Sequence, residues 1–146
     1  MTQVQFAKYE FKVKERDGHK FIFDIARKKW VALTNEEWVR QHIVHYLVND
    51  KKYPLNHIAV ERGIELNGLA KRFDVVVFSN AGIPALIIEC KEPDEVLNEK
   101  VFEQIARYNL SLRVNYLWVT NGDKNYCCSL VAGIRLLEVV PEYADL

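Results

Sequence analysis

Two carboxylates and one lysine stand at the ends of two apolar runs near the middle of the 146-residue chain. Asp74 begins the run DVVVF, and Glu89 and Lys91 end the run ALIIECK. Apolar runs rich in Val and Ile, separated by a short break that contains Gly82, are typical of two strands joined by a hairpin turn. Side chains two positions apart in a strand share a face, so Glu89 and Lys91 are expected to project together.

The turns set the predicted register of these strands. A two-residue loop at 81–82, or a four-residue loop around it, places Asp74 directly opposite Glu89, with their Cβ atoms about 5 Å apart. The Asn-Gly pair at 67–68 is a strong signal for another hairpin, and counting outward from it places Glu61 opposite Asp74. Glu61, Asp74 and Glu89 are therefore predicted to form one row across three antiparallel strands.

Three carboxylates side by side repel one another strongly unless a cation lies among them. Ligands that are all oxygen atoms favour a hard ion, so the row predicts Mg²⁺, with Mn²⁺ as the usual substitute. Such an ion lowers the pKa of a bound water and polarises a phosphoryl oxygen, which is the chemistry of phosphodiester hydrolysis. A surface Glu–Lys pair near an Asp turn is the alternative interpretation, but it leaves three facing carboxylates unexplained.

The order of Asp74, a hairpin and then Glu-x-Lys resembles the signature of the PD-(D/E)XK nuclease superfamily. With the downstream segments FEQIARYN and YLWVTNG, the chain from about Tyr9 to its end resembles the N-terminal nuclease domain of type I restriction enzyme R subunits, in the short stand-alone form. Phe73 replaces the Pro of the signature, which carries no chemistry. The resemblance implies a Mg²⁺-dependent DNA nuclease with a role in restriction, defence or DNA processing.

The predicted row supplies the carboxylates of Asp74 and Glu89 as metal ligands, and Glu61 either holds a second ion or stays outside the coordination sphere. The resemblance implies one more ligand, the backbone carbonyl of Cys90. Lys91, with an ordinary pKa of about 10.4, starts as a cation that orients the attacking water and stabilises the pentavalent phosphorane. It serves as a base only if the metal and burial depress its pKa.

Gln104 and Tyr108 resemble the Gln-x-x-x-Tyr motif that follows Glu-x-Lys in one branch of the superfamily, where it orients the catalytic lysine and contacts DNA. Both residues lie on one side of a predicted helix, one turn apart. The alternative for Gln104 is a position at the edge of the apolar stripe, facing water. For Tyr108, a place in the site and packing within the stripe are both kept as interpretations.

The elements that must position these residues make a mixed α/β, restriction-endonuclease-like fold. Three antiparallel strands are predicted, over 57–66, 69–78 and 84–91. Alternation along them places Ile64 and Phe73 on the same face as Val75. Both faces of this meander are apolar enough to require cover, which predicts a helix on each side of the sheet.

A helix is predicted over 34–49, because apolar residues recur there at helical spacing. Thr34 and Glu37 form a capping box at its start. Trp38 on this helix, and Trp118 further along the chain, are predicted to lie in the core.

A second helix is predicted from 95 or 98 to 112, with Tyr108 in its apolar stripe. The strand that follows, 115–121, is expected to lie parallel to 84–91, since a strand–helix–strand crossover is right-handed. Further strands are predicted over 125–131 and 134–139.

The first 30 or so residues are predicted to form an extension of a single domain that spans 1–146. Residues 9–25 alternate between apolar and polar around the Asp-Gly pair at 17–18, as in a β-hairpin. We expect this hairpin to cap an edge of the sheet or to cover the core. The three basic residues at 27–29 are expected to form a solvated turn, with a phosphate contact as the alternative.

The composition is that of a globular chain, with 49% hydrophobic and 27% charged residues. Twenty basic and twenty acidic residues cancel, which argues against tight, non-specific DNA binding by this chain alone without excluding a local basic patch. No apolar run reaches the roughly 18 residues of a membrane span and no signal peptide is evident, so a cytoplasmic protein is expected. The cysteine spacing does not suit zinc, and without a P-loop no nucleotide cofactor is expected.

Two functions follow from these residues. The first is a metal-dependent deoxyribonuclease that acts on DNA by itself, as a homodimer or with a partner subunit. The second is a non-catalytic DNA-binding or assembly module that keeps the nuclease fold as a scaffold. Asp74, Glu89 and Lys91 together favour the nuclease, because a scaffold has no need of them. The missing motor and the neutral charge favour dependence on a partner.

Overall fold

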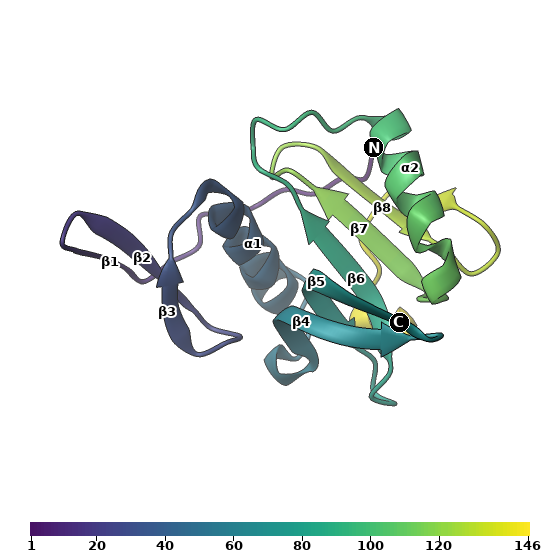
Figure 1. The fold of residues 1–146 in the computed structure, drawn as a ribbon, viewed down its shortest axis with the longest axis horizontal. Coiled ribbons are helices and arrows are strands. Elements are labelled where there is room, and N and C mark those ends of the chain that lie inside the picture. Colours follow the sequence, from purple (N-terminus) through teal and green to yellow (C-terminus); the bar gives the residue numbers. More distant parts are fainter.

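The computed structural model describes all 146 residues as a mixed α/β fold, as predicted (Figure 1). A six-stranded sheet forms its centre, in the order β4-β5-β6-β7-β8-β9. The strands are β4 (Ile58–Leu66), β5 (Leu69–Phe78), β6 (Pro84–Cys90), β7 (Tyr116–Thr120), β8 (Asn125–Ser129) and β9 (Arg135–Leu136). β6 and β7 run parallel and the other neighbouring pairs are antiparallel, which confirms the pairing predicted across the second helix.

One helix covers each face of this sheet, as the apolar pattern on both faces predicts (Figure 1). On one face lies α1 (Asn35–His45), which continues as a π-helical turn over Tyr46–Asp50. On the other face lies α2 (Glu99–Asn109), which ends in a 3-10 turn over Leu110–Leu112. Short 3-10 turns also occupy Leu55–His57 and Tyr143–Asp145. None of the helices has the length and apolar character needed to cross a membrane.

Each helix begins at a side chain that caps its first turn. Thr34 Oγ1 accepts a hydrogen bond from the backbone N–H of Glu37 at 3.0 Å. Asn98 Oδ1 accepts one from the N–H at position 101, at 2.9 Å. The carboxylate of Glu37 does not complete the predicted capping box, because it binds Arg27 and Arg40 instead.

Two aromatic side chains lie elsewhere than predicted. Trp118 is fully buried as expected, but Trp38 is 41% exposed and Tyr108 is 74% exposed. The buried stripe of α2 runs instead through Phe102 and Asn109. The helix is turned this way because the amide group of Asn109 is paired with polar side chains of β5 and β6. The predicted place of Tyr108 in the stripe is therefore wrong.

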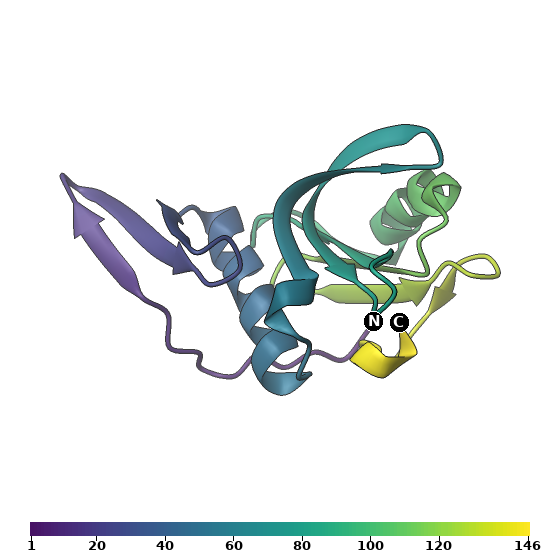
Figure 2. The ribbon, with the colours of Figure 1, turned by 90° about the horizontal axis from the view of Figure 1, so that it is seen from below.

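β4 and β5 keep the predicted register but break the predicted alternation. The pairs on either side leave Glu61 facing Asp74. Glu61 has a φ of +55°, a left-handed conformation that costs a non-glycine residue about 1–2 kcal/mol. Beyond this point Ile64 and Phe73 pack in the apolar cluster between the sheet and α2. Val75 packs in the apolar cluster between the sheet and α1. The predicted shared face is wrong because the backbone adopts a left-handed conformation at Glu61, and the two strands are strongly curved (Figure 2).

The N-terminal residues form a second sheet rather than an edge of the first. Its strands are β1 (Val13–Arg16), β2 (His19–Asp24) and β3 (Lys29–Ala32), paired antiparallel in that order. The hairpin within 9–25 is confirmed, but it does not cap the central sheet, and the expected turn at 27–29 leads into a third strand. This sheet lies beside α1 and projects away from the rest of the molecule (Figures 1 and 2).

His45, at the end of α1, should make the stability of the fold depend on pH. It is 7% exposed, its Nε2 has no hydrogen-bond partner, and its ring centre lies 4.6 Å from that of Phe11. Burial, followed by the charge of His42, lowers the pKa of His45 from an ordinary value of about 6.5. The unfolded chain therefore takes up a proton first as the pH falls. The free energy of unfolding should decrease from about pH 7 to about pH 5.

Urea unfolding midpoints measured between about pH 8 and about pH 5 check this expectation. His45→Phe keeps a neutral ring beside Phe11 and should flatten the decrease below about pH 6.5. His19→Gln, at an exposed position of β2, is the matched control and should keep the decrease. An unchanged pH dependence in His45→Phe would show that another group is responsible.

Candidate functional site

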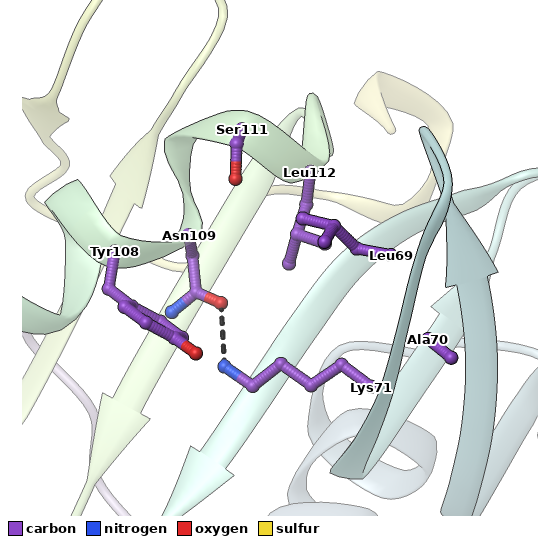
Figure 3. A pocket seen from close by; sticks show the side chains of 7 residues that line it. All are labelled: Leu69, Ala70, Lys71, Tyr108, Asn109, Ser111 and Leu112. Carbon is purple, nitrogen blue, oxygen red and sulfur yellow. Dashed lines mark hydrogen bonds between the residues drawn. The ribbon is translucent and has the colours of Figure 1, made fainter.

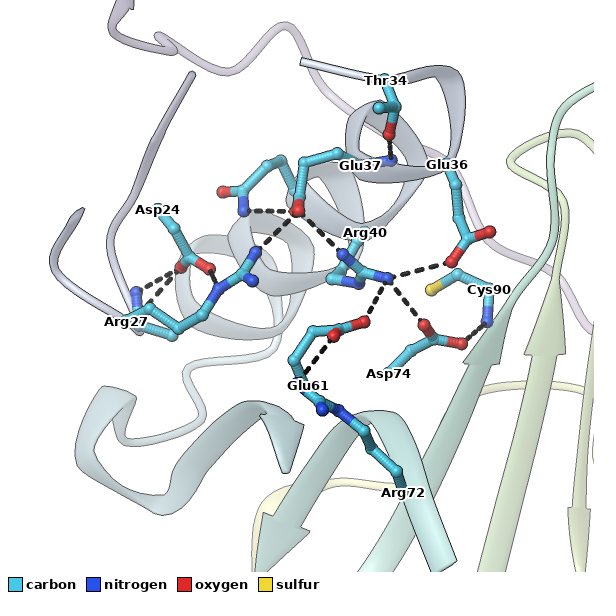
Figure 4. A network of polar contacts seen from close by, with 12 residues as sticks. Asp24, Arg27, Thr34, Glu36, Glu37, Arg40, Glu61, Arg72, Asp74 and Cys90 are labelled. Atoms are coloured by element: carbon cyan, nitrogen blue, oxygen red, sulfur yellow. Dashed lines mark hydrogen bonds and ion pairs between the residues drawn. The ribbon is translucent and has the colours of Figure 1, made fainter. Parts of the chain in front are cut away.

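Arg40 lies at the centre of a cluster of carboxylates between α1 and the sheet (Figure 4). Its Nη2 donates to Oδ1 of Asp74 at 2.7 Å and to Oε1 of Glu61 at 2.9 Å. Nη2 also donates to Oε1 of Glu36 at 3.0 Å, and Nη1 donates to Oε1 of Glu37 at 2.7 Å. One guanidinium thus joins two acidic residues of the helix to two predicted site residues on β4 and β5.

The charges in this cluster depend on one another. Burial disfavours the charged form of Arg40, but the hydrogen bond to Asp74 and the charge of Glu37 outweigh it and raise the pKa of Arg40. Arg40 is therefore a permanent cation. Burial, followed by the charge of Asp74, raises the pKa of the Glu36 carboxyl. The guanidinium is the main counter-charge that allows these acids to lie together.

The cluster continues to the N-terminal sheet through Arg27. Nη2 of Arg27 donates to Oε1 of Glu37 at 2.7 Å, and Nε of Arg27 pairs with the carboxylate of Asp24. Asp24 ends β2 and is fully buried. A continuous chain of ion pairs therefore links β2 to Arg40 and on to Asp74 on β5 (Figure 4).

Asp74 lies where β5 and β6 separate. Its Oδ1 is bound by Arg40, and its Oδ2 accepts a hydrogen bond from the backbone N–H of Cys90 at 2.8 Å. The last pair between the two strands is Val75 with Ile88, which leaves Asp74 facing Glu89 as expected, although a register shift between Val77 and Phe78 replaces the predicted loop at 81–82. Because N–H and C=O of one residue in a strand point to the same neighbour, we expect the carbonyl of Cys90 on the Asp74 side. Burial raises the pKa of the Cys90 thiol, so the thiol stays protonated.

Glu89 has different surroundings. Its Oε1 accepts a hydrogen bond from Nζ of Lys71 at 3.2 Å and lies 3.5 Å from Nδ2 of Asn109. Nζ of Lys71 also donates to Oδ1 of Asn109 at 2.9 Å and lies 4.7 Å from the centre of the Tyr108 ring. These three residues line a cavity of about 280 Å³ beside α2 (Figure 3). Glu89 therefore faces α2, whereas Asp74 faces α1.

The remaining predicted site residues are not drawn together with these carboxylates. Lys91 follows β6 directly and is half-buried, and its backbone N–H donates to the carbonyl of Thr120 at 2.7 Å. Gln104 is exposed on α2. Tyr108 lies beside Lys71 rather than Lys91. The structure places both members of the Gln-x-x-x-Tyr pair on the outer side of α2, and their roles stay predictions.

Sequence reasoning missed Arg40, Lys71 and Asn109. The only signal for Arg40 is its spacing from Glu36, because residues four apart on a helix are neighbours and opposite charges there indicate an ion pair. Lys71 and Asn109 are separated by 38 residues, so nothing local in the sequence indicates their contact. Their contacts arise only in the folded chain, where α1 and α2 pack against the region in which β5 and β6 separate.

The donors at this site fit a hard cation in part. Mg²⁺ is commonly held by one or two carboxylates, with waters and substrate phosphates completing its octahedral shell. Asp74, Glu89 and the carbonyl of Cys90 supply oxygen donors of that kind. A site of three carboxylates is not formed, since no three His, Cys, Asp or Glu side chains lie together in a way that could hold a metal ion. The reason is that Glu61 and Asp74 are drawn to Arg40, while Glu89 is drawn to Lys71.

Comparison with known proteins agrees with this architecture. A sequence model of the family described as type I restriction enzyme R protein N terminus matches residues 35–142. A crystal structure from Anabaena variabilis ATCC 29413, described as a candidate nuclease belonging to DUF820, superimposes with a TM-score of 0.51. That match has 14% sequence identity and covers 81% of this chain and 80% of the other, so it concerns the fold. No curated protein sequence matches the chain.

Proposed function

Since the chain belongs to the family of type I restriction enzyme R protein N termini, we propose that it is a nuclease that hydrolyses DNA phosphodiester bonds with Mg²⁺. Mn²⁺ would substitute for Mg²⁺, because both accept oxygen ligands. The observation that carries the proposal is the position of Asp74 opposite Glu89, with Lys91 two residues further on, where β5 and β6 separate. In the free protein Asp74 is bound by Arg40 of α1 and Glu89 by Lys71 and Asn109 on the α2 side, so one ion held by both carboxylates requires the two side chains to turn toward each other. With Lys91 they would then hold a hard cation and present positive charge to a phosphate.

Each residue has its own part in this proposal. Asp74, Glu89 and the carbonyl of Cys90 would hold the ion, which supplies a nucleophilic water at neutral pH and neutralises charge on a phosphoryl oxygen. Lys91 stabilises the negative charge that develops on the phosphate as the bond breaks. Glu61 stays beside Asp74 on the Arg40 guanidinium and helps to orient it.

Arg40 limits how the ion can bind. Each carboxylate oxygen of Asp74 already accepts one hydrogen bond, from Arg40 and from the Cys90 N–H. A carboxylate oxygen has further lone pairs, so an ion can coordinate Asp74, but it does so next to a fixed positive charge. We therefore propose that divalent ions bind weakly to the free protein and more tightly once DNA phosphates add negative charge.

The exposed residues of α2 suggest how DNA is held. Gln104 and Tyr108 both face solvent, so they would contact the DNA backbone rather than hold Lys91. The family description supports a role in restriction or defence. A second copy of the chain or a partner subunit would then supply further DNA recognition, and a partner subunit would supply any motor.

The second candidate function is a non-catalytic module that binds DNA or assembles with partners. The observation that favours it is the pairing of the acidic residues with cations of the same chain. Asp74 is held by Arg40, and Glu89 by Lys71, as in a network that serves stability alone. Metal binding and cleavage distinguish this function from the nuclease.

Lys91→Ala is the substitution that separates the two functions. The lysine is not expected to be a ligand, so Mn²⁺ affinity measured by calorimetry should stay within about twofold of wild type. Cleavage of plasmid and single-stranded DNA, followed over a titration of Mg²⁺ or Mn²⁺, should fall by about 10²–10³-fold, because one charge aimed at the reacting phosphate is lost.

Lys124→Ala is the matched control, because it removes an exposed lysine from the turn between β7 and β8. It should bind the ion and cleave DNA as wild type does. If wild-type protein neither binds divalent ions nor cuts DNA, the non-catalytic function takes the place of the nuclease. If Lys91→Ala cuts as well as wild type, the role given to Lys91 is wrong.

A further inference from the structure

The strand pairing of the N-terminal sheet gathers cations and aromatic rings on one face. Lys14 pairs with Phe21, and Phe23 pairs with Trp30, and facing residues of antiparallel strands share a face. The members of this basic–aromatic face are Lys12, Lys14, Arg16, Phe21, Phe23 and Trp30. Nζ of Lys14 lies 4.3 Å from the Trp30 ring centre, which confirms that the two side chains meet on this face.

The opposite face of the same sheet is turned to the protein only around Ile22 and Asp24, and its residues in β1 are exposed. Ile22 is fully buried there, and Asp24 is buried in its ion pair with Arg27. The Phe11 ring, at the same end of the sheet, packs 5.0 Å from the ring of Trp38 on α1. The basic–aromatic face is therefore left to solvent, and Trp30 on it is 37% exposed.

Positive charge is concentrated in this part of the chain. Residues 12–29 hold seven lysines and arginines but three acidic residues, whereas the whole chain is neutral. The acidic residues lie off the basic–aromatic face: Glu15 pairs with Lys20 on the other face, Asp17 is in the turn, and Asp24 is buried. Within residues 12–29 the face thus carries cations without a carboxylate beside them.

We propose that the basic–aromatic face binds a strand of DNA. Cations at every second residue of β1 stand about 7 Å apart along the strand and can follow a chain of phosphates. Half-exposed aromatic rings beside them can stack on unpaired bases. Phosphate alone or an acidic peptide would need the cations but not the aromatic rings, so the combination favours nucleic acid.

The structure also ties this face to the site at Asp74. Arg27, between β2 and β3, pairs with Glu37 on α1, and Glu37 pairs with the Arg40 guanidinium that holds Asp74. DNA held on the N-terminal sheet would therefore lie on a part of the molecule that ion pairs connect to Asp74. The sheet lies before residue 35, where the match to the family begins, so this surface is an addition to the part shared with the family.

This inference rests on the proposed function only for the choice of DNA as the nucleic acid, and its test does not need cleavage. Binding is measured by fluorescence anisotropy with labelled DNA of about 20 nucleotides, single-stranded and double-stranded, in EDTA so that no divalent ion is present. The salt concentration is varied from about 50 mM to about 200 mM.

The test variant replaces Lys12, Lys14 and Arg16 by Gln. It should bind DNA at least about tenfold more weakly, and the slope of log K against log salt should decrease by about two to three, because up to three phosphate contacts are lost. The control variant replaces Lys52, Lys124 and Arg135 by Gln, three exposed cations elsewhere on the surface. It should bind within about twofold of wild type.

Trp30→Leu tests the aromatic part of the face. It should weaken binding of the single strand by about tenfold and change binding of the duplex less, because stacking needs an unpaired base. Equal weakening of both forms would show that the face holds only the phosphates of DNA and would overturn the stacking role. All the substituted residues are at least partly exposed, and circular dichroism with urea unfolding confirms that the variants are folded.

Three outcomes would overturn the proposal. They are no DNA binding by wild type at low salt, equal weakening in the control variant, and binding of wild type to phosphatidylserine vesicles but not to DNA. The outcome of the proposed function is separate. If the triple variant loses DNA binding but wild type does not cut DNA, the binding face stands and the nuclease fails. If Lys91→Ala abolishes cleavage while the triple variant binds DNA normally, the nuclease stands and the face fails.

Discussion

Asp74→Asn is expected to reduce DNA cleavage by at least about 10³-fold, the effect of losing several kcal/mol of charge stabilisation in the transition state. The substitution removes a negative ligand and turns one acceptor oxygen into an N–H₂ donor. Asp74 uses both oxygens, for Arg40 and for the N–H of Cys90, so Asn can satisfy only one of these partners. Initial cleavage rates with Mg²⁺ and with Mn²⁺ measure the loss of activity, and Mn²⁺ calorimetry measures the loss of metal affinity.

Asp94→Asn is the control, because it makes the same chemical change at an exposed position in the loop after β6. It should cut DNA and bind Mn²⁺ within about twofold of wild type, as expected for a surface substitution away from the site. Circular dichroism and urea unfolding must show that Asp74→Asn is folded. A folded Asp74→Asn that cuts like wild type would remove the place where β5 and β6 separate from consideration as the active site.

Arg40→Met is expected to lower the free energy of unfolding by about 3–5 kcal/mol, the usual cost of leaving buried charges without their partner. Met keeps much of the side-chain length but supplies no charge. Glu36 and Asp74 would lose the only cation that contacts them, and Glu37 would keep only Arg27. Urea unfolding at neutral pH measures the loss, which should shrink at acid pH as the carboxyl groups become protonated.

Arg107→Met is the matched control, since this side chain is 73% exposed and lies 3.8 Å from Glu103. Removing it should cost less than about 1 kcal/mol. Millimolar Mg²⁺ should recover more stability in Arg40→Met than in wild type, because the ion can then take the place of the guanidinium among the carboxylates. If Arg40→Met is as stable as wild type, the role given to Arg40 in stability is wrong. If Mg²⁺ stabilises both proteins equally, Arg40 and the metal do not compete for these carboxylates.

The register of the central meander could be predicted from short stretches of sequence. An Asn-Gly turn needs a particular backbone conformation, and neighbouring strands then pair by counting outward from it. Glu61 and Asp74 face each other as that counting predicts. Asp74 also faces Glu89, but the predicted loop at 81–82 is wrong: Ser79 bonds Ile83 across the turn, and a register shift between Val77 and Phe78 restores the expected pairing. The two-sided apolar pattern likewise predicted a helix on each face of the sheet, and the crossover predicted the parallel strand β7.

The direction in which these carboxylates point was not predictable from the turns. The left-handed conformation of Glu61 changes which face of the sheet the following side chains point to. No glycine at that position signals it in the sequence. The same is true of α2, which turns Tyr108 outward because Asn109 finds polar partners on β5 and β6. Alternation and helical spacing assume regular elements, and both assumptions fail where a polar contact is stronger than the local preference.

The local sequence thus determines which adjacent strands pair, and with them the positions of Asp74 and Glu89 along the strands. It does not determine the partners of those carboxylates, because Arg40 reaches Asp74 across 34 residues and a long side chain has many rotamers from which packing selects one. The basic–aromatic face arose in the same way, since alternation orders its residues along each strand but only the contact with α1 decides which face meets solvent. Local preferences determine the pairing of neighbouring strands, and the packing of distant segments determines which charges meet.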